Sequence, residues 1–385
     1  MVRKRTGKIV VMHLAARYPL AGVMWQLLHH LIGFRQLGFD VYYIEDNGGV
    51  WVYDPSLSNT TDDPRHNVKL LADALETYGF KDRWAFIFDY PRQHYYGMEP
   101  RQALELIADA DAVINLCAAM RPRDEILRSR CLIYLETDPS DTAVRESEFV
   151  APHKLHFTYG YNIGAPDCIL PTGNINWRRT RPPVLLDQWL PGTGPAEPAT
   201  FTTVGTWQNK GHDIQIAGET YYWSKHLNFR QLLEIPRRTG QPMEMATDLN
   251  SGPDYQRAIA GGFKIVPAVP MSVNLDSYRQ YIASSRGEFT AAKDLYVRTR
   301  SGWFSDRSVC YLAAGRPVIT QRTVFEKFIP TGAGLLGFDD ADEAVEAVHA
   351  VNADYTRHAK AAREIACEYF DALKLLDEIA QSAGL

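Results

Sequence analysis

The chain has 385 residues, of which 45% are hydrophobic and 23% are charged, and its formal net charge is -5 at pH 7. These values are typical of a globular protein and exclude a disordered or fibrous chain, and the length fits two domains of ordinary size. The acidic balance argues against a protein built mainly to bind a nucleic-acid backbone, which would need a strong basic excess.

The cysteines and the N-terminal segment indicate the compartment. The five cysteines are scattered and never spaced as C-x-x-C, which favours reduced thiols over disulfides or a zinc site. The apolar run at residues 9–16 follows three basic residues, as in a signal peptide, but it is short and contains His13, so a buried first strand fits it better. No other stretch is long enough to span a bilayer. We therefore expect a cytoplasmic protein without a transmembrane segment, and peripheral membrane contact stays an open alternative.

The first half of the chain alternates strand-like and helix-like segments. Residues 8–15 form an almost continuous apolar run, as in a parallel strand buried on both faces, and residues 19–37 carry apolar side chains at helical spacing up to Gly38. The pattern then predicts strands at 40–45, 84–88, 112–117, 131–135 and 153–159, and helices at 67–78 and 100–108. This order predicts an open, mostly parallel sheet with helices on both faces.

A Pro/Gly-rich stretch at residues 181–199 predicts a linker between two domains, at residues 1–180 and 200–385. After the linker the pattern predicts strands at 201–204, 242–246, 263–266, 294–298 and 318–321. It also predicts helices at 223–234, 275–283, 306–314, 341–350 and 354–380, the last closing the chain. Two Rossmann-like α/β lobes that face each other across a cleft are the most economical architecture.

The segment SGWFSDRSVCYLAAGRPVI at residues 301–319 is the most informative part of the sequence. A glycine–aromatic turn leads into polar capping residues and an apolar helix, which ends at Gly315 before a buried strand. At such a helix start, backbone N–H groups and the helix dipole favour a diphosphate, and Arg307 in the first turn is unfavourable without an anion. An ordinary capped helix is the alternative. The candidate donor-binding residues here are Gly302, Trp303, Phe304, Ser305, Asp306, Arg307 and Ser308.

This segment resembles the donor motif of the retaining GT-B glycosyltransferases, E-G-F-G-x-x-x-L-E-A-M-A-x-G-x-P-V. The matching residues are Phe304, Ala313, Gly315, Pro317 and Val318. The two glutamates that hold the donor in that family correspond here to Gly302 and Cys310. Those contacts would therefore have to come from other residues, namely Asp306, Arg307, Ser308 or Glu288. The resemblance implies a GT-B fold and the metal-independent transfer of a sugar, hexosyl-like, from a nucleotide diphosphate sugar bound to the second lobe.

Two weaker matches extend the resemblance. Residues 19–23, PLAGV, stand where the first lobe of the family has P-x-x-G-G. Residues 204–211, VGTWQNKG, stand where its second lobe has V-G-R-x-x-x-x-K-G. The arginine is missing, but Lys210 keeps the phosphate-binding role that the resemblance implies.

The stretch SSRGEFT at residues 284–290, with Lys293 after it, is predicted to be a loop that lines the cleft. Arg286 or Lys293 would pair with phosphate, and Glu288 with ribose hydroxyls. A solvated loop with an internal ion pair is the alternative.

His13 and Asp138 follow predicted strands at the same edge of the first sheet, so they are candidates for catalysis or for contact with the acceptor. A structural histidine and a turn-forming aspartate are the alternatives. Tyr18, Gly22 and Trp25, near the opening of the first lobe, are candidates for acceptor binding, the rings by stacking.

No metal site or tightly bound cofactor is expected. The D-x-D at residues 109–111 runs from a helix end into a strand, and the histidines show no H-E-x-x-H spacing. G-x-G-x-x-G after the first strand, Walker A and G-x-S-x-G motifs are also missing. The sequence therefore predicts a glycosyltransferase with a nucleotide sugar as co-substrate and a small molecule, glycan or lipid-linked acceptor. A GT-B-fold epimerase or phosphorylase, or a non-catalytic nucleotide-sugar-binding protein, is the alternative.

Overall fold

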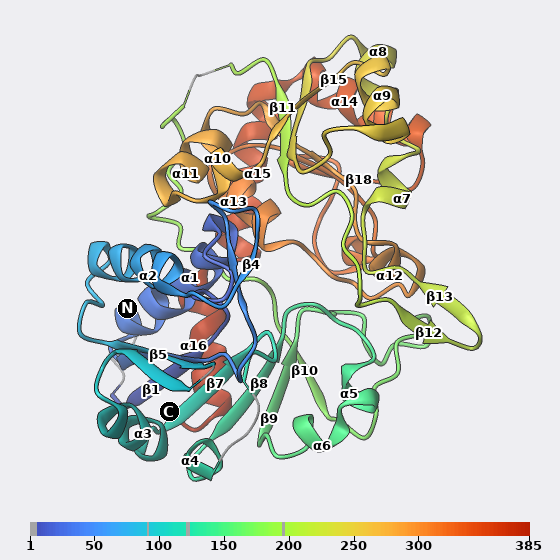
Figure 1. The fold of residues 1–385 in the computed structure, drawn as a ribbon. Helices are drawn as coiled ribbons and strands as arrows, with labels where there is room; N and C mark the ends of the chain where they lie inside the picture. The colour runs from blue at the N-terminus through green and yellow to red at the C-terminus, as the bar shows by residue number, and fades with distance from the viewer. Residues whose placement is uncertain (1–5, 91, 121–123, 195–196) are drawn as a thin grey trace.

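The computed structural model describes residues 6–90, 92–120, 124–194 and 197–385. Its strands form two large sheets, each with helices packed beside it, and the two resulting lobes lie one above the other in Figure 1. Among the described helices, none is both long and apolar enough to cross a membrane.

The first lobe is built on an eight-stranded sheet in the order β10-β9-β8-β7-β1-β2-β5-β6, parallel apart from the antiparallel edge strand β6. Its strands are β1 (Lys8–Met12), β2 (Asp40–Asp46), β5 (Trp84–Asp89), β6 (Gln93–Gly97), β7 (Ala112–Leu116), β8 (Leu132–Glu136), β9 (Leu155–Thr158) and β10 (Trp177–Arg179). A hairpin, β3 (Val52–Asp54) and β4 (Asn59–Thr61), follows β2. The helices are α1 (Ala21–Leu37), α2 (Arg65–Thr77), α3 (Pro100–Asp109), α4 (Asp124–Leu127), α5 (Thr142–Arg145) and α6 (Ser147–Val150).

Strand β1 shows why a continuous apolar run becomes a central strand. Ile9 and Val11 belong to the core that includes α1, whereas Val10 and Met12 belong to a second core that includes α3. Successive side chains of a strand point to opposite faces, so the run is buried on both sides. The strand ends at Met12, which places His13 at the carboxyl edge of the sheet.

The second lobe is built on a six-stranded parallel sheet in the order β15-β14-β11-β16-β17-β18. Its strands are β11 (Phe201–Val204), β14 (Met243–Thr247), β15 (Phe263–Pro267), β16 (Gly287–Thr290), β17 (Val318–Gln321) and β18 (Leu335–Phe338), and a hairpin is formed by β12 (Ile214–Ile216) and β13 (Glu219–Tyr221). The helices are α7 (His226–Phe229), α8 (Ile235–Thr239), α9 (Gly252–Ala260), α10 (Val269–Ser272), α11 (Leu275–Ala283), α12 (Asp294–Arg298), α13 (Asp306–Ala313), α14 (Ala341–Ala353) and α15 (Tyr355–Tyr369).

Strand β16 corrects the prediction of a cleft-lining loop at residues 284–290. All four of its residues are buried, and it pairs with β11 on one side and β17 on the other. Gly287 is needed there, because a Cβ atom would lie 2.3 Å from the Pro317 carbonyl oxygen. The segment was predicted to be a loop because most of its residues are polar, although it contains a central strand.

Three further predictions of secondary structure are corrected. Residues 294–298, predicted as a strand, form the short helix α12, because a short apolar run does not distinguish the two. Residues 223–234 form only the four-residue helix α7 and turns. The helix predicted at 354–380 is two helices, because the Asp371 side chain accepts the Leu373 N–H and starts α16 (Ala372–Ser382).

Helix α16 lies against α1 of the first lobe (Figure 1). Gly33 allows the close approach, since a Cβ atom there would be 2.4 Å from Leu376 Cδ1. The C-terminal helix of the chain therefore packs on the first lobe. The predicted division into domains at residues 1–180 and 200–385 remains a proposal, which describes the two sheets but not this helix.

Candidate functional site

The carboxyl ends of the two sheets meet at the boundary between the lobes. After β8, Thr137 O accepts the Trp303 Nε1–H at 2.8 Å, and Asp138 Oδ1 lies 2.8 Å from Lys293 Nζ, which follows β16. Asn162 N also donates to Ser301 O at 3.0 Å. Ligands of open α/β sheets bind at such edges, so this boundary is the candidate site.

A pocket of about 270 Å³ lies between the first turns of α1 and α13. Gly22 and Gln26 line it from the first lobe, and Gly205, Asp306 and Arg307 from the second. Helix α1 starts without a side-chain cap or an acidic residue in its first turn, so no side chain of the helix competes for its N–H groups. The positive ends of two helix dipoles, one from each lobe, therefore converge on one pocket, and both favour an anion.

A chain of polar contacts crosses the pocket from His13 to Asp306. His13 Nε2 lies 2.8 Å from Gln26 Oε1, which also accepts from Cys117 Sγ at 3.3 Å. A hydrogen bond from Gln26 reaches Asp306. Burial lowers the pKa of His13 to about 4 and raises the pKa of Asp306 to about 7. The histidine is therefore neutral at pH 7, and the aspartate titrates there.

Lysine and arginine side chains gather on the side of the second lobe. Lys225 interacts electrostatically with the cations Arg307 and Lys293, and with the carboxylates Glu288 and Asp138. No carboxylate of the described residues lies within ion-pairing distance of Lys225. Burial, and then the neighbouring Arg307, lower the pKa of Lys225 well below its ordinary value. A bound anion would relieve both effects.

Arg307 forms an ion pair with Glu288, whose side chain is completely buried. The guanidinium also donates to Val204 O at 2.7 Å and to Thr290 Oγ1 at 3.0 Å. The two residues, predicted separately for phosphate and ribose, thus contact each other and join α13 to β16 and β11, and their contacts with a donor stay a prediction. Arg307 still reaches the wall of the pocket.

Lys293 and Asp138 form the corresponding pair across the lobes. Burial alone would raise the pKa of Asp138, but the Lys293 ammonium and hydrogen bonds from Lys293 and Tyr296 lower it. The Asp138 side chain keeps 44% of its surface exposed, whereas Lys293 is buried over the Trp223 ring, 3.3 Å from its centroid. The pair is therefore charged and faces the cleft through Asp138.

The glycine–aromatic turn, predicted to bind the donor, packs against other parts of the protein. Gly302 has φ +73°, and a Cβ atom there would lie 2.6 Å from Asn162 N of the first lobe. The Trp303 ring lies over Tyr296 with centroids 4.4 Å apart, and Phe304 stacks on Phe370. The turn clamps the lobes together, because only glycine fits this contact.

The remaining predicted residues lie at different distances from the pocket. Arg286 is corrected: it precedes β16 at the opposite edge of the sheet and donates to Asn352 Oδ1 and Pro198 O. Lys210 is exposed in the loop after β11. Ser308 is buried in α13, one turn from the pocket. Trp25 is 1% exposed and forms part of the pocket wall, and Tyr18 is half-buried beneath the Arg17 guanidinium.

Sequence reasoning missed Gln26 and Lys225. Gln26 lies one helical turn after Gly22 on the pocket side of α1, a spacing that could have suggested it. Lys225 comes from the segment between β13 and α7, where no motif pointed to it. Among the described residues, no group of three His, Cys, Asp or Glu side chains is close enough to hold a metal ion.

Comparison with known proteins supports this arrangement at the level of the fold. No protein-family model matches the chain, and no curated protein is similar to it in sequence. Solved structures do match over the whole chain. An alpha-glucosyltransferase in complex with UDP and a 13-mer DNA containing a HMU base has a TM-score of 0.62 at 11% identity, covering 99% of this chain and 100% of that one.

Two other glycosyltransferases match to a similar extent. AviGT4, involved in avilamycin A biosynthesis, has a TM-score of 0.59 at 11% identity and covers 98% of this chain and 97% of its own. HepE from Anabaena, in complex with UDP and glucose, has a TM-score of 0.56 at 13% identity and covers 98% and 99%. With its two Rossmann-like lobes and the site between their carboxyl edges, the chain therefore has the GT-B fold, as the resemblance of the motif at residues 301–319 implies.

Proposed function

We propose that the chain is a glycosyltransferase that moves a sugar from a nucleoside diphosphate sugar to an acceptor. The observation that carries this proposal is the pocket at which the first turns of α1 and α13 meet, within a GT-B fold. The start of α1 has no side-chain cap, and the start of α13, which belongs to the motif at residues 301–319, carries Arg307 to the wall of the pocket.

The diphosphate is the part of the donor that these groups suit best. Backbone N–H groups of both helices would bind its oxygens, and Lys225 would supply a positive charge that has no carboxylate partner among the described residues. Lys210 is a second lysine that could reach the phosphates from the loop after β11. Stabilising the nucleoside diphosphate as it leaves is the chemistry that such a cluster performs without a bound metal.

The remaining polar groups suit the sugar and the acceptor. Asp306 and Gln26 line the pocket and would bind donor hydroxyls. Asp138, charged and partly exposed, would face the acceptor, while His13 is buried and neutral and would hold Gln26 in place. His13 is thus proposed as a positioning residue, and Asp138 as the catalytic candidate. The scattered cysteines support a cytoplasmic location.

A non-catalytic nucleotide-sugar-binding protein is the second candidate. It is favoured by Cys310, which stands where the family motif has a glutamate and is only 2% exposed. Release of free nucleotide from the donor, measured with and without candidate acceptors, separates the two candidates. Turnover of donor to nucleotide is expected for the glycosyltransferase.

The first experiment is a thermal-shift and calorimetric comparison of UDP-, GDP-, ADP- and TDP-sugars. UDP-sugars come first because two of the similar structures contain UDP. A ligand at about 100 times its Kd stabilises the folded protein by about 2.7 kcal/mol, which is a shift of several degrees. Inorganic phosphate and uridine are the matched controls. If none of the four nucleotide sugars stabilises the protein, the proposal is wrong.

A further inference from the structure

Two aromatic rings are exposed side by side at the carboxyl edge of the first sheet. Trp51 is 45% exposed and Tyr90 is 37% exposed, and their ring centroids are 6.0 Å apart at an angle of 68°. Val50 beside them is also exposed. Exposed aromatic clusters of this kind are uncommon on a protein surface unless they bind something.

The pair is held in place by a buried asparagine. Asn47 is 6% exposed and accepts the N–H groups of Gly49 and Asp89 through Oδ1, both at 3.1 Å, while its amide donates to Val50 O. One side chain thus ties the loop that carries Trp51 to the end of β5, which carries Tyr90. The rings are preorganised, so a ligand would lose little conformational entropy by binding them.

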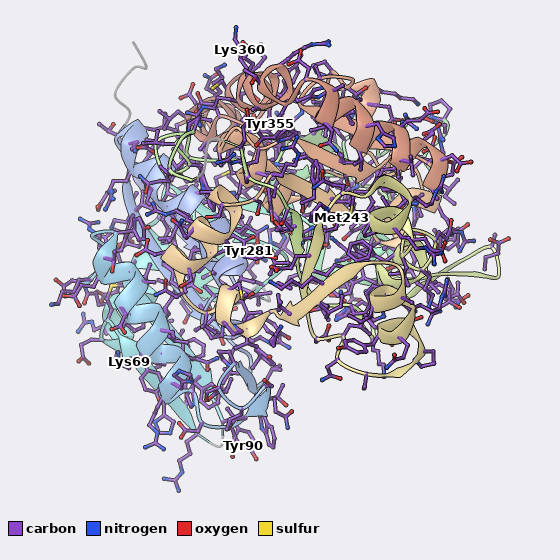
Figure 2. The ribbon with its side chains drawn as sticks, turned by 90° about the horizontal axis from the view of Figure 1, so that it is seen from above. Lys69, Tyr90, Met243, Tyr281, Tyr355 and Lys360 are labelled. Atoms are coloured by element: carbon purple, nitrogen blue, oxygen red, sulfur yellow. The ribbon has the colours of Figure 1, made fainter. Side chains whose placement is uncertain are left out.

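The position of the pair relates it to the pocket. Strands β1, β2 and β5 are parallel neighbours, and Tyr90 follows β5 as His13 follows β1. Neighbouring strands are about 4.8 Å apart, so the end of β5 lies roughly 10 Å along the edge from the end of β1. The hairpin connects the two places, since Tyr53 N donates to Arg17 O at 2.9 Å. In the view from above, Tyr90 lies at the outer end of the first lobe (Figure 2).

The charges around the pair restrict the ligand. Asp46, Asp62 and Asp89 lie on the segments that carry or flank the rings, and these three carboxylates outnumber the one arginine there, Arg92, which is two residues after Tyr90. Carboxylates there repel a phosphate backbone or an anionic lipid surface, and they accept hydrogen bonds from hydroxyl groups. Flat apolar rings among hydroxyl acceptors suit the C–H face of a pyranose.

We infer that Trp51 and Tyr90 form a binding platform for a neutral oligosaccharide acceptor. It would hold a sugar unit of the acceptor outside the pocket, at a distance from the hydroxyl that reacts. This inference rests on the proposed function for its place in the reaction, and it narrows the acceptor from small molecule, glycan or lipid-linked sugar to a glycan at least two units long.

The test measures binding to immobilised tetrasaccharides of glucose, mannose, galactose and N-acetylglucosamine, with a short DNA duplex and phosphatidylglycerol vesicles as other probes. The wild type is expected to bind at least one tetrasaccharide and neither other probe. Trp51→Ala and Tyr90→Ala should each weaken that binding about tenfold. Trp51→Phe should retain most of it, and Leu127→Ala, an exposed apolar residue elsewhere on the first lobe, should retain all of it.

Donor binding is measured on the same variants, so the two proposals fail separately. Unchanged affinity for UDP-glucose with weakened tetrasaccharide binding supports the platform. Binding of DNA or vesicles through Trp51, equal tetrasaccharide binding by wild type and the double alanine variant, or no tetrasaccharide binding at millimolar concentration would overturn it. A platform that binds tetrasaccharide in a protein that binds no nucleotide sugar would overturn only the proposed function.

Discussion

The two faces of the cleft differ in charge. On the edge of the first lobe, burial shifts the pKa of His13 to about 4, of Glu45 to about 7 and of Glu136 to about 8, in each case toward the neutral form. On the edge of the second lobe, burial lowers the pKa values of Lys225 and Lys293. Of these two lysines, Lys293 alone forms an ion pair with a carboxylate among the described residues, and the first lobe supplies that carboxylate.

This difference indicates which substrate belongs to which face. The side chains named on the first face are neutral or, at Asp138, negative, so they cannot balance a diphosphate, whereas the half-buried Lys225 would gain from one. Neutral and weakly acidic groups suit the hydroxyls of an acceptor. The comparison therefore predicts that changes in the second lobe act on donor affinity, and that changes in the first lobe leave it nearly unchanged.

The largest expected effect is on stability, and it tests whether the ion pair of Arg307 and Glu288 holds the second lobe's side of the cleft together. Arg307→Ala leaves Glu288 charged and completely buried, so the free energy of unfolding should fall by about 3–5 kcal/mol. Urea denaturation measures it. The double variant Arg307→Met/Glu288→Gln removes both charges and should recover most of the loss. A stable Arg307→Ala variant would show that the pair does not hold the face together.

Lys225→Met tests the cation that has no carboxylate partner. Loss of one charge-assisted contact with a diphosphate corresponds to about 1.5–3 kcal/mol, or about a 10- to 100-fold weaker Kd for UDP. Stability should not fall, because the variant also removes a buried charge. Lys360→Met, an exposed lysine on the far side of the second lobe, is the matched control (Figure 2). Equal Kd values for both variants would remove Lys225 from the donor site.

Much of this fold could be predicted from the sequence, for a physical reason. Helix α11 has the predicted bounds, because its buried apolar residues repeat at helical spacing, and the short strand β11 also has the predicted bounds. Strand β16 was missed because Glu288 is buried with a partner nineteen positions later in the chain, and no local pattern reports such a contact. This polar segment lies in the centre of the sheet because of its contacts with residues that are distant in the sequence. Its own composition does not predict that position.

The site was predictable only where it coincides with a helix start. The polar residues before α13 announced that helix, so Ser305 and Asp306 were found. Lys225 belongs to an irregular segment, and the aromatic pair of Trp51 and Tyr90 joins two loops that lie 39 positions apart in the sequence. Neither arrangement leaves a periodic or motif-like trace.

The pH dependence of donor binding tests the role of Asp306, which lies in the pocket between the two lobes. Burial raises the pKa of Asp306 to about 7, so its carboxyl is neutral below that pH and charged above it. A charged carboxylate beside a diphosphate repels it, so UDP affinity should fall as the pH rises from 6 to 8.5. A shift of one pKa unit on binding corresponds to about a tenfold change. Calorimetry at several pH values measures it.

Asp306→Asn removes the titrating group and should flatten that profile. Asp340→Asn is the control, because Asp340 is also an aspartate at the start of a helix, α14, and lies outside the pocket. A profile that keeps its slope in Asp306→Asn would assign the pH dependence to another group, such as Lys225. In that case Asp306 would line the pocket without acting on the donor's charge.

The smallest expected effect tests the first lobe's part in holding the diphosphate. Gly22→Ala places a methyl group in the pocket, 3.5 Å from the Tyr278 hydroxyl, without a strained φ. Stability should change by less than about 1 kcal/mol, since alanine favours the helix. Donor affinity should fall only a few-fold (about 0.5–1 kcal/mol), because the methyl group crowds the N–H groups of α1 but removes no charge.

Gly33→Ala on the same helix is the matched control, with the opposite pattern. Its Cβ atom would overlap Leu376 of α16, so the free energy of unfolding should fall by about 1–3 kcal/mol while donor affinity stays unchanged. If Gly22→Ala leaves donor affinity at the wild-type value, the diphosphate does not reach α1. The second lobe alone would then bind the donor, and the difference between the two faces would be sharper than the structure of the pocket indicates.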